Sequence, residues 1–136
     1  METIKNPFGW AEIYVDDIAR AQKFYETVLQ IEMQAAPMPE GMNAEKGSDD
    51  YFEMVFFPAN MDAPGMGGAI VKSALFKPGA GGTLNYFACE DCAVELSRVE
   101  AAGGKVISGK MSIGEYGFCG IGIDTEGNHI GFHSMK

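Results

Sequence analysis

One unit of sequence occurs twice in this chain of 136 residues, and this repetition limits the possible folds more than any other feature. In the stretch 8–30, residues alternate as in a strand up to Val15, two acidic residues follow, and apolar residues then recur at helical spacing. The stretch 84–103 has the same order. Each half of the chain therefore follows the order strand, helix and three strands, which indicates an internal duplication.

The duplicated pattern predicts an α+β fold made of two tandem β-α-β-β-β modules. We expect module 1 over about 8–77, a Pro- and Gly-rich linker over 78–82, and module 2 over about 83–135. Either half alone would leave a large apolar sheet face uncovered. The sequence therefore predicts a single domain over 1–136.

The chain is acidic, with 19 Asp and Glu residues against 10 Lys and Arg residues and a formal net charge of −9. We expect no nucleic-acid partner, because such binders need basic patches to displace counterions and no run of Lys or Arg is present. No apolar run approaches the roughly 20 residues of a membrane helix, so we expect no membrane partner. Three cysteines and an N-terminus without signal-peptide features favour free thiols and a cytoplasmic location.

The first predicted strand has one amphipathic face. Trp10, Glu12 and Tyr14 share this face, and the aliphatic residues between them share the other, which should meet a helix. Two aromatic rings beside a carboxylate suit a binding cleft, but Trp10 and Tyr14 could equally be core residues. The acids that follow, Asp16 and Asp17, are placed to cap the coming helix.

A Cys-x-x-Cys pattern, Cys89 and Cys92, leads into the second predicted helix. A helix N-terminus can lower the pKa of a thiol, so redox work or metal binding is one interpretation. The neighbouring acids Glu90 and Asp91 oppose thiolate formation. The pattern therefore favours structural cysteines.

Three stretches together resemble the vicinal oxygen chelate superfamily, which includes glyoxalases, bleomycin resistance proteins and extradiol dioxygenases. They are YVDDIARAQKFYETVL at 14–29, EDCAVELSRVEAAGGKV at 90–106 and DTEGNHIGFHS at 124–134. The most specific parts are the FY pair, the AAGG helix exit and the DxxGNxIG turn, and the Trp-x-Glu opening is similar to a glyoxalase-like branch. The resemblance implies that the sheets curl into a mixed-sheet cup with the helices packed outside.

The same resemblance shows that the usual metal ligands are missing. Metal-dependent members keep ligands at positions that correspond here to Trp10, Leu84 and Gly131, and a further one on the fourth strand, where 67–76 offers no carboxylate or imidazole. None of these residues can donate to a divalent cation. We therefore expect no metal cofactor at the superfamily position.

A displaced site is the alternative. Glu12 lies on the same strand face as Trp10, and His129 and His133 flank Gly131, so these side chains could converge to bind a divalent metal or to transfer a proton α to a carbonyl. The simpler interpretation places His129 in the turn and leaves His133 solvated.

The leading hypothesis is a protein that binds a small apolar or aromatic molecule in the cup without a metal, with Glu12 as polar anchor and with room left by Gly131. Two alternatives stay open: a metal-dependent lyase, isomerase or dioxygenase of glyoxalase type, and a structural module whose cup is filled by its own side chains. Two-module relatives often pair, so a second copy is an expected partner. The predicted ligand-binding residues are Trp10, Glu12, Tyr14, Tyr86, His129 and His133.

Overall fold

A computed structural model describes residues 6–37, 51–60 and 62–136 of the chain. The elements, in chain order, are β1 (Trp10–Tyr14), α1 (Ile18–Leu29), β2 (Gln34–Ala35), β3 (Phe52–Phe56), β4 (Gly67–Ser73), β5 (Asn85–Ala88), α2 (Cys92–Val99), β6 (Lys105–Ser112), a 3-10 turn (Gly114–Tyr116), β7 (Phe118–Ile123) and β8 (His129–Ser134). Among these residues no helix is long and apolar enough to cross a membrane.

Acidic residues begin both helices, as the sequence predicts. The Asp17 side chain accepts a hydrogen bond of 3.0 Å from the Arg20 N–H at the start of α1. Asp91 accepts one of the same length from the Ala93 N–H at the start of α2. Each bond satisfies a backbone donor that the first helical turn leaves free.

The two modules have the same strand connections, which confirms the α+β fold and the duplication. Their sheets have the orders β1-β4-β3-β2 and β5-β8-β7-β6. In each module the first strand runs parallel to the last, and the remaining pairs are antiparallel. Within the described residues these are two four-stranded mixed sheets, and no ladder joins them into one.

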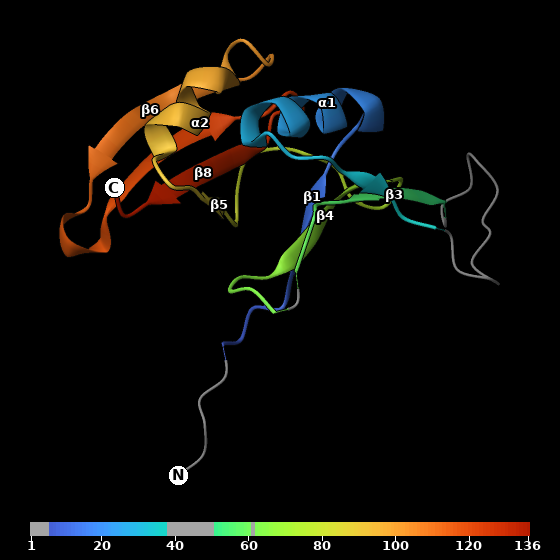
Figure 1. The fold of residues 1–136 in the computed structure, drawn as a ribbon. Coiled ribbons are helices and arrows are strands. Elements are labelled where there is room, and N and C mark those ends of the chain that lie inside the picture. The colour runs from blue at the N-terminus through green and yellow to red at the C-terminus, as the bar shows by residue number, and fades with distance from the viewer. Residues whose placement is uncertain (1–5, 38–50, 61) are drawn as a thin grey trace.

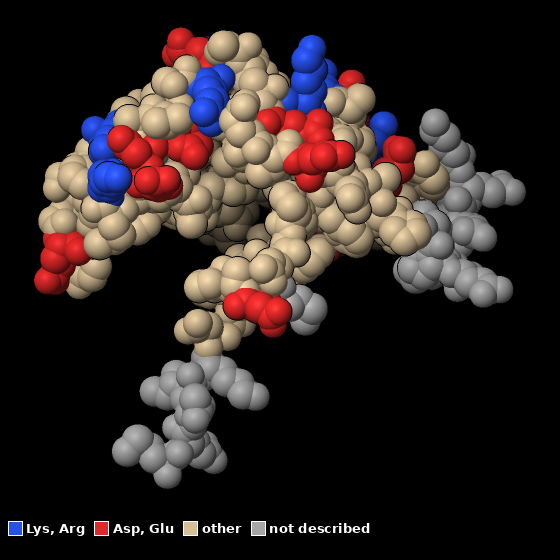
Figure 2. Space-filling view, viewed as in Figure 1, with Lys and Arg blue, Asp and Glu red and all other residues tan. Residues whose placement is uncertain are grey.

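Both helices cover the same side of the molecule, and the two sheets diverge beneath them (Figure 1). α1 and α2 contact each other, and the Arg98 guanidinium donates a hydrogen bond of 3.1 Å to the Val28 carbonyl. The opposite sheet faces turn away from the helices, and the space-filling view shows the molecule hollowed on that side (Figure 2). We call this side the concave side.

The hydrophobic core lies between the helices and the sheets and is continuous across the modules. Ile13 and Val15 are buried in it, as the alternation in the first strand predicts. The centroid of the Tyr25 ring of α1 lies 5.4 Å from that of Phe57, which follows β3. Both of these centroids lie 5.7 Å from that of Phe87 on β5. Burying these rings together stabilises each module against the other.

Candidate ligand-binding site

Glu12 is held between two aromatic side chains on the concave face of β1. The Trp10 indole Nε1–H donates to one carboxylate oxygen at 3.1 Å, and the Tyr14 hydroxyl donates to the other at 3.2 Å. Burial raises the pKa of Tyr14, and the charge and the hydrogen bond of Glu12 raise it further. Tyr14 therefore stays a protonated donor, and the three residues form one connected row along the strand.

The Trp10 ring lies across β4, where the residue opposite it is Gly67. A Cβ atom at Gly67 would lie only 3.1 Å from the Trp10 ring. On β3 the Phe56 ring stands at 86° to the indole, with 5.9 Å between the ring centroids. Glycine thus lets the indole approach the sheet, and the two rings form an aromatic corner.

This corner belongs to a hollow of about 460 Å³ on module 1, which we call the Trp10 hollow. Its volume is within the range of small-molecule sites. The Trp10 side chain is 48% exposed and forms part of the wall, so this ring is not a core residue. The lining residues are Trp10, Glu32, Gln34, Phe56, Phe57, Pro58, Ala59 and Gly67.

Tyr14 is turned away from this hollow. Its ring stacks on Phe76, with 4.8 Å between centroids and 21° between planes. Of the two aromatic residues of β1 that were predicted to line a ligand site, Trp10 lines the Trp10 hollow, whereas Tyr14 stacks on Phe76, which follows β4.

On module 2, Tyr86 covers the position that Gly131 was expected to leave free. The two residues are opposite each other on β5 and β8, and a Cβ atom at Gly131 would lie 2.4 Å from the Tyr86 ring. The expectation of ligand space at Gly131 is therefore wrong. The ring itself takes that space.

A second hollow, of about 350 Å³, lies beside this ring. His133 lines it, and its Nε2 lies 2.6 Å from the Tyr116 carbonyl oxygen, so the side chain is not simply solvated. A carbonyl only accepts, so Nε2 carries a proton and Nδ1 is the possible acceptor in the neutral ring. The lining residues are Tyr86, Ala88, Ile113, Cys119 and His133.

The structure does not gather Glu12, His129 and His133 into one cluster. The Glu12 oxygens bind Trp10 and Tyr14, and the two histidines are four residues apart on one strand, which corresponds to about 13 Å. Over residues 6–37, 51–60 and 62–136, no group of three His, Cys, Asp or Glu side chains could hold a metal ion. Within the described residues these three side chains therefore do not form the displaced metal site.

The residues at the superfamily's metal position do not fit a divalent cation. Trp10 offers an indole whose N–H is already donated to Glu12, Leu84 offers an alkyl chain, and Gly131 lies beneath the Tyr86 ring. A divalent cation needs several oxygen, nitrogen or sulfur donors.

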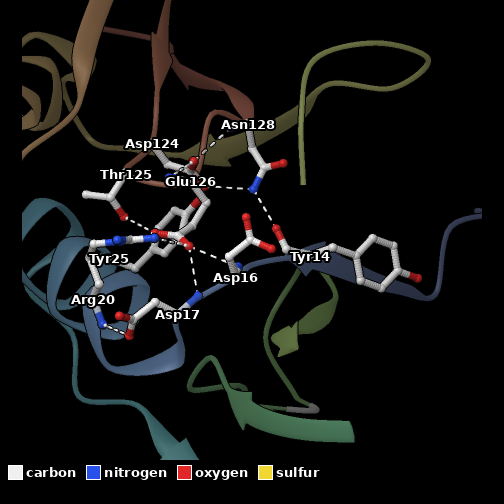
Figure 3. Close-up of polar contacts among 9 residues, drawn as sticks. All are labelled: Tyr14, Asp16, Asp17, Arg20, Tyr25, Asp124, Thr125, Glu126 and Asn128. Carbon is white, nitrogen blue, oxygen red and sulfur yellow. Dashed lines mark hydrogen bonds and ion pairs between the residues drawn. The ribbon is translucent and has the colours of Figure 1, made fainter. Parts of the chain in front are cut away.

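A polar cluster joins the β7–β8 turn to the start of module 1 (Figure 3). Tyr25 donates a hydrogen bond of 2.5 Å to the buried Asp124. The Asn128 amide donates to Asp124 at 3.0 Å and to the Tyr14 carbonyl at 2.7 Å. The FY pair and the DxxGN turn, distant in sequence, thus contact each other and fix the end of β1.

Glu126 completes this cluster, and its side chain is 0% exposed. The Arg20 guanidinium donates to it at 2.6 and 2.9 Å, and the Asp16 and Asp17 N–H groups each donate at 2.9 Å. Burial raises the pKa of Glu126, but these bonds and one from Thr125 outweigh burial and lower it to about 2. The β7–β8 turn thus carries an ion pair that anchors the start of α1.

Sequence reasoning named Trp10 but missed the other residues of its hollow. Gly67 was only the first residue of a predicted strand, and Phe56 was not singled out. The pairing of β4 with β1 on one side and with β3 on the other places both residues near Trp10. A glycine in the strand next to an aromatic residue was the available signal, because such glycines often mark a close approach.

Comparisons with known proteins agree with this fold. Residues 8–44 match a family described as bleomycin resistance protein-like N-terminal. The comparison with curated proteins gave no match. Among solved structures, a hypothetical protein from S. aureus is 13% identical, with 97% of this chain and 99% of that chain covered and a TM-score of 0.63.

Two further solved structures are similar. A glyoxalase/bleomycin resistance protein from Albidiferax ferrireducens is 18% identical over 95% of this chain and 98% of that chain, with a TM-score of 0.62. Glyoxalase I from Zea mays is 15% identical over 92% of this chain but only 43% of that chain, with a TM-score of 0.66. At such identities the likeness shows a shared fold and not a shared activity.

The chain thus has the fold of the solved glyoxalase/bleomycin resistance structures, and its N-terminal segment, residues 8–44, matches a bleomycin resistance protein-like family.

Proposed function

We propose that this chain binds a small apolar or aromatic molecule in the Trp10 hollow without a metal. The observation that carries the proposal is the aromatic corner of Trp10 and Phe56 above Gly67, in a hollow of about 460 Å³. Small-molecule sites generally combine apolar and aromatic walls with few polar groups. Glu32 and Gln34 supply such groups here.

The family match supports the same proposal. The matched segment, 8–44, contains Trp10, Glu32 and Gln34, and the family is named after bleomycin resistance proteins. The residues at the superfamily's metal position lack donors, so binding rather than metal-dependent catalysis is the activity that this set of residues favours.

Fluorescence of Trp10, the single tryptophan, provides a direct test. Titration with a panel of small aromatic and apolar molecules should change the emission of the wild type, and a chelator should not alter the binding curve. The Phe56→Ala variant keeps the fluorophore and should bind about five- to tenfold more weakly, since an aromatic wall residue contributes about 1–1.5 kcal/mol. Tyr86→Ala, which removes an exposed ring from module 2, is the matched control and should bind normally.

The result that contradicts the proposal is equally direct. If no panel molecule changes the Trp10 emission or the melting temperature, the hollow has no ligand of this class. If Tyr86→Ala weakens binding and Phe56→Ala does not, the ligand binds on module 2 instead.

We also propose that two copies associate. Several large apolar side chains are at least 50% exposed, which is typical of surfaces that meet a partner when they lie together. Light scattering across a concentration series should give the mass of a dimer, and a monomer mass at every concentration would contradict association. The side chains concerned are Phe8, Leu75, Phe76, Tyr86, Ile107, Tyr116 and Met135.

A further inference from the structure

We infer that the ligand of the Trp10 hollow is an organic cation, namely a tertiary or quaternary ammonium group with small apolar substituents. This inference rests on the proposed function and adds the charge of the ligand. It depends on the orientation of two rings, the placement of two carboxylates and the kinds of residue that line the hollow.

The aromatic corner offers π surface in two nearly perpendicular orientations. Both Trp10 and Phe56 line the hollow, and their planes meet at 86° with 5.9 Å between centroids. The face of an aromatic ring carries partial negative charge, and cations within about 6 Å of its centre are attracted to it, most strongly by tryptophan. Two such faces at right angles can contact a tetrahedral ammonium group from two sides.

Glu12 makes the indole a better cation acceptor. Its carboxylate receives the Trp10 Nε1–H at 3.1 Å, and the same carboxylate is held from the other side by the Tyr14 hydroxyl at 3.2 Å. A negative charge on the N–H edge adds to the negative potential over the ring. The charge is also fixed in place, since both oxygens have a donor.

The charge of the lining itself has one sign. Glu32 lines the hollow, the other polar lining residue is the neutral Gln34, and over residues 6–37, 51–60 and 62–136 no Lys, Arg or His lines it. In Figure 2 the basic side chains lie along the outer, helix-bearing side, whereas the hollowed side is mostly uncharged. Glu32 would repel an anionic ligand, which has no basic group to pair with among the described lining residues, and it would attract a cation.

Choline and its neutral isostere 3,3-dimethylbutan-1-ol separate this inference from the proposed function. The two molecules have nearly the same shape and differ in one positive charge. We expect choline to bind about tenfold more tightly, from Trp10 fluorescence or calorimetry at low salt, because a partly desolvated cation–π contact is worth about 1–2 kcal/mol. Added salt should reduce the ratio, since the hollow is open to solvent.

Substitutions in the lining test whether the preference for choline arises in the Trp10 hollow. Glu32→Gln should lower the ratio of choline affinity to alcohol affinity severalfold. Glu53→Gln is the matched control and should leave this ratio unchanged, because Glu53 faces away from the hollow on β3. Phe56→Ala should also lower the ratio. If its melting curve shows misfolding, Phe56→Leu replaces it, since leucine keeps the apolar volume and removes the π face.

Each outcome has a definite meaning. Equal binding of choline and the alcohol by the wild type overturns the cation inference and leaves the proposed function standing. A choline preference that persists unchanged in Glu32→Gln and Phe56→Ala places the cation elsewhere and also overturns the inference. If neither molecule binds, and no member of the apolar panel does, both proposals fail.

Discussion

At the residue scale, the three cysteines differ in how accessible their thiols are. Burial raises the pKa of Cys89 to about 12, with a further contribution from the charge of Glu95. The acid responsible is thus Glu95, one turn into α2, rather than Glu90 or Asp91. Cys92 is fully buried, and Cys119 lines the hollow beside Tyr86.

We therefore predict that Cys119 reacts first with iodoacetamide. At pH 8 a thiol with a pKa near 12 is on the order of 0.01% thiolate, so Cys89 should react on the order of a thousandfold more slowly than an ordinary cysteine. Peptide mass spectrometry after short labelling measures all three sites at once. Labelling in urea is the control and should modify the three equally; prompt native labelling of Cys89 would contradict the prediction.

A second prediction concerns the contact between Tyr86 and Gly131. Gly131→Ala would place a methyl group 2.4 Å from the Tyr86 ring, so the ring must move away or the strands must separate. We expect this substitution to lower the free energy of unfolding by about 1–3 kcal/mol.

A double-mutant cycle in urea tests this cause. In a Tyr86→Ala background, Gly131→Ala should lower the free energy of unfolding much less than in the wild type, because the displaced ring is absent. An equal cost in both backgrounds would mean that Gly131 is required for a reason other than Tyr86.

At the element scale, the β7–β8 turn holds the start of α1 through Glu126. Its carboxyl has a pKa near 2 in the folded chain against an ordinary value of 4.5, so its contribution is full above about pH 4.5 and is lost as the pH falls towards 2. Glu126→Gln should remove about 2–3 kcal/mol at pH 7, since the side chain is 0% exposed and the substitution breaks its charged pair with Arg20.

Urea unfolding from pH 7 to pH 2.5 measures this contribution. The wild type should lose stability as the pH falls from 4.5 to 2.5, and the curve of Glu126→Gln should be flatter over that range. Glu100→Gln, which changes an exposed glutamate at the end of α2, is the matched control and should keep the wild-type curve. Parallel curves for wild type and Glu126→Gln would show that this carboxyl does not set the acid response.

Local signals predicted the elements, whereas the site depended on contacts that local sequence does not encode. The caps Asp17 and Asp91 and the shared face of β1 follow from patterns a few residues long. Glu126 was expected only to form part of a turn, yet its carboxylate binds Arg20, 106 residues away. The Trp10 hollow likewise depends on the pairing of β1 with β4, and the covering of Gly131 depends on the direction of one ring.

At the scale of the whole molecule, the two modules share a core and a polar cluster, and the single domain over 1–136 stays a prediction. The shared core suggests how to test it. Tyr25 belongs to module 1, Asp124 to module 2, and burial raises the pKa of the phenol well above its ordinary value, so Tyr25 remains the donor in this bond.

We predict that Tyr25→Phe destabilises both modules together. Asp124 keeps its bonds from the Glu126 and Asn128 N–H groups, at 2.8 and 2.9 Å, so its own turn survives while the tie to α1 is lost. Removing one partner of a buried hydrogen bond lowers the free energy of unfolding by about 1–3 kcal/mol. If the two sheets share one core and unfold cooperatively, both lose this stability. Hydrogen exchange should therefore become faster by a similar factor for the most protected amides of β4 and of β8.

Tyr116→Phe is the matched control, because that ring is largely exposed and its hydroxyl donates no hydrogen bond to the part of module 1 that the structure describes. It should leave both exchange rates unchanged. If Tyr25→Phe accelerates exchange in β4 alone and leaves β8 protected, the modules unfold separately. The cluster would then align two independent units instead of joining one, and the Trp10 hollow would depend on module 1 alone.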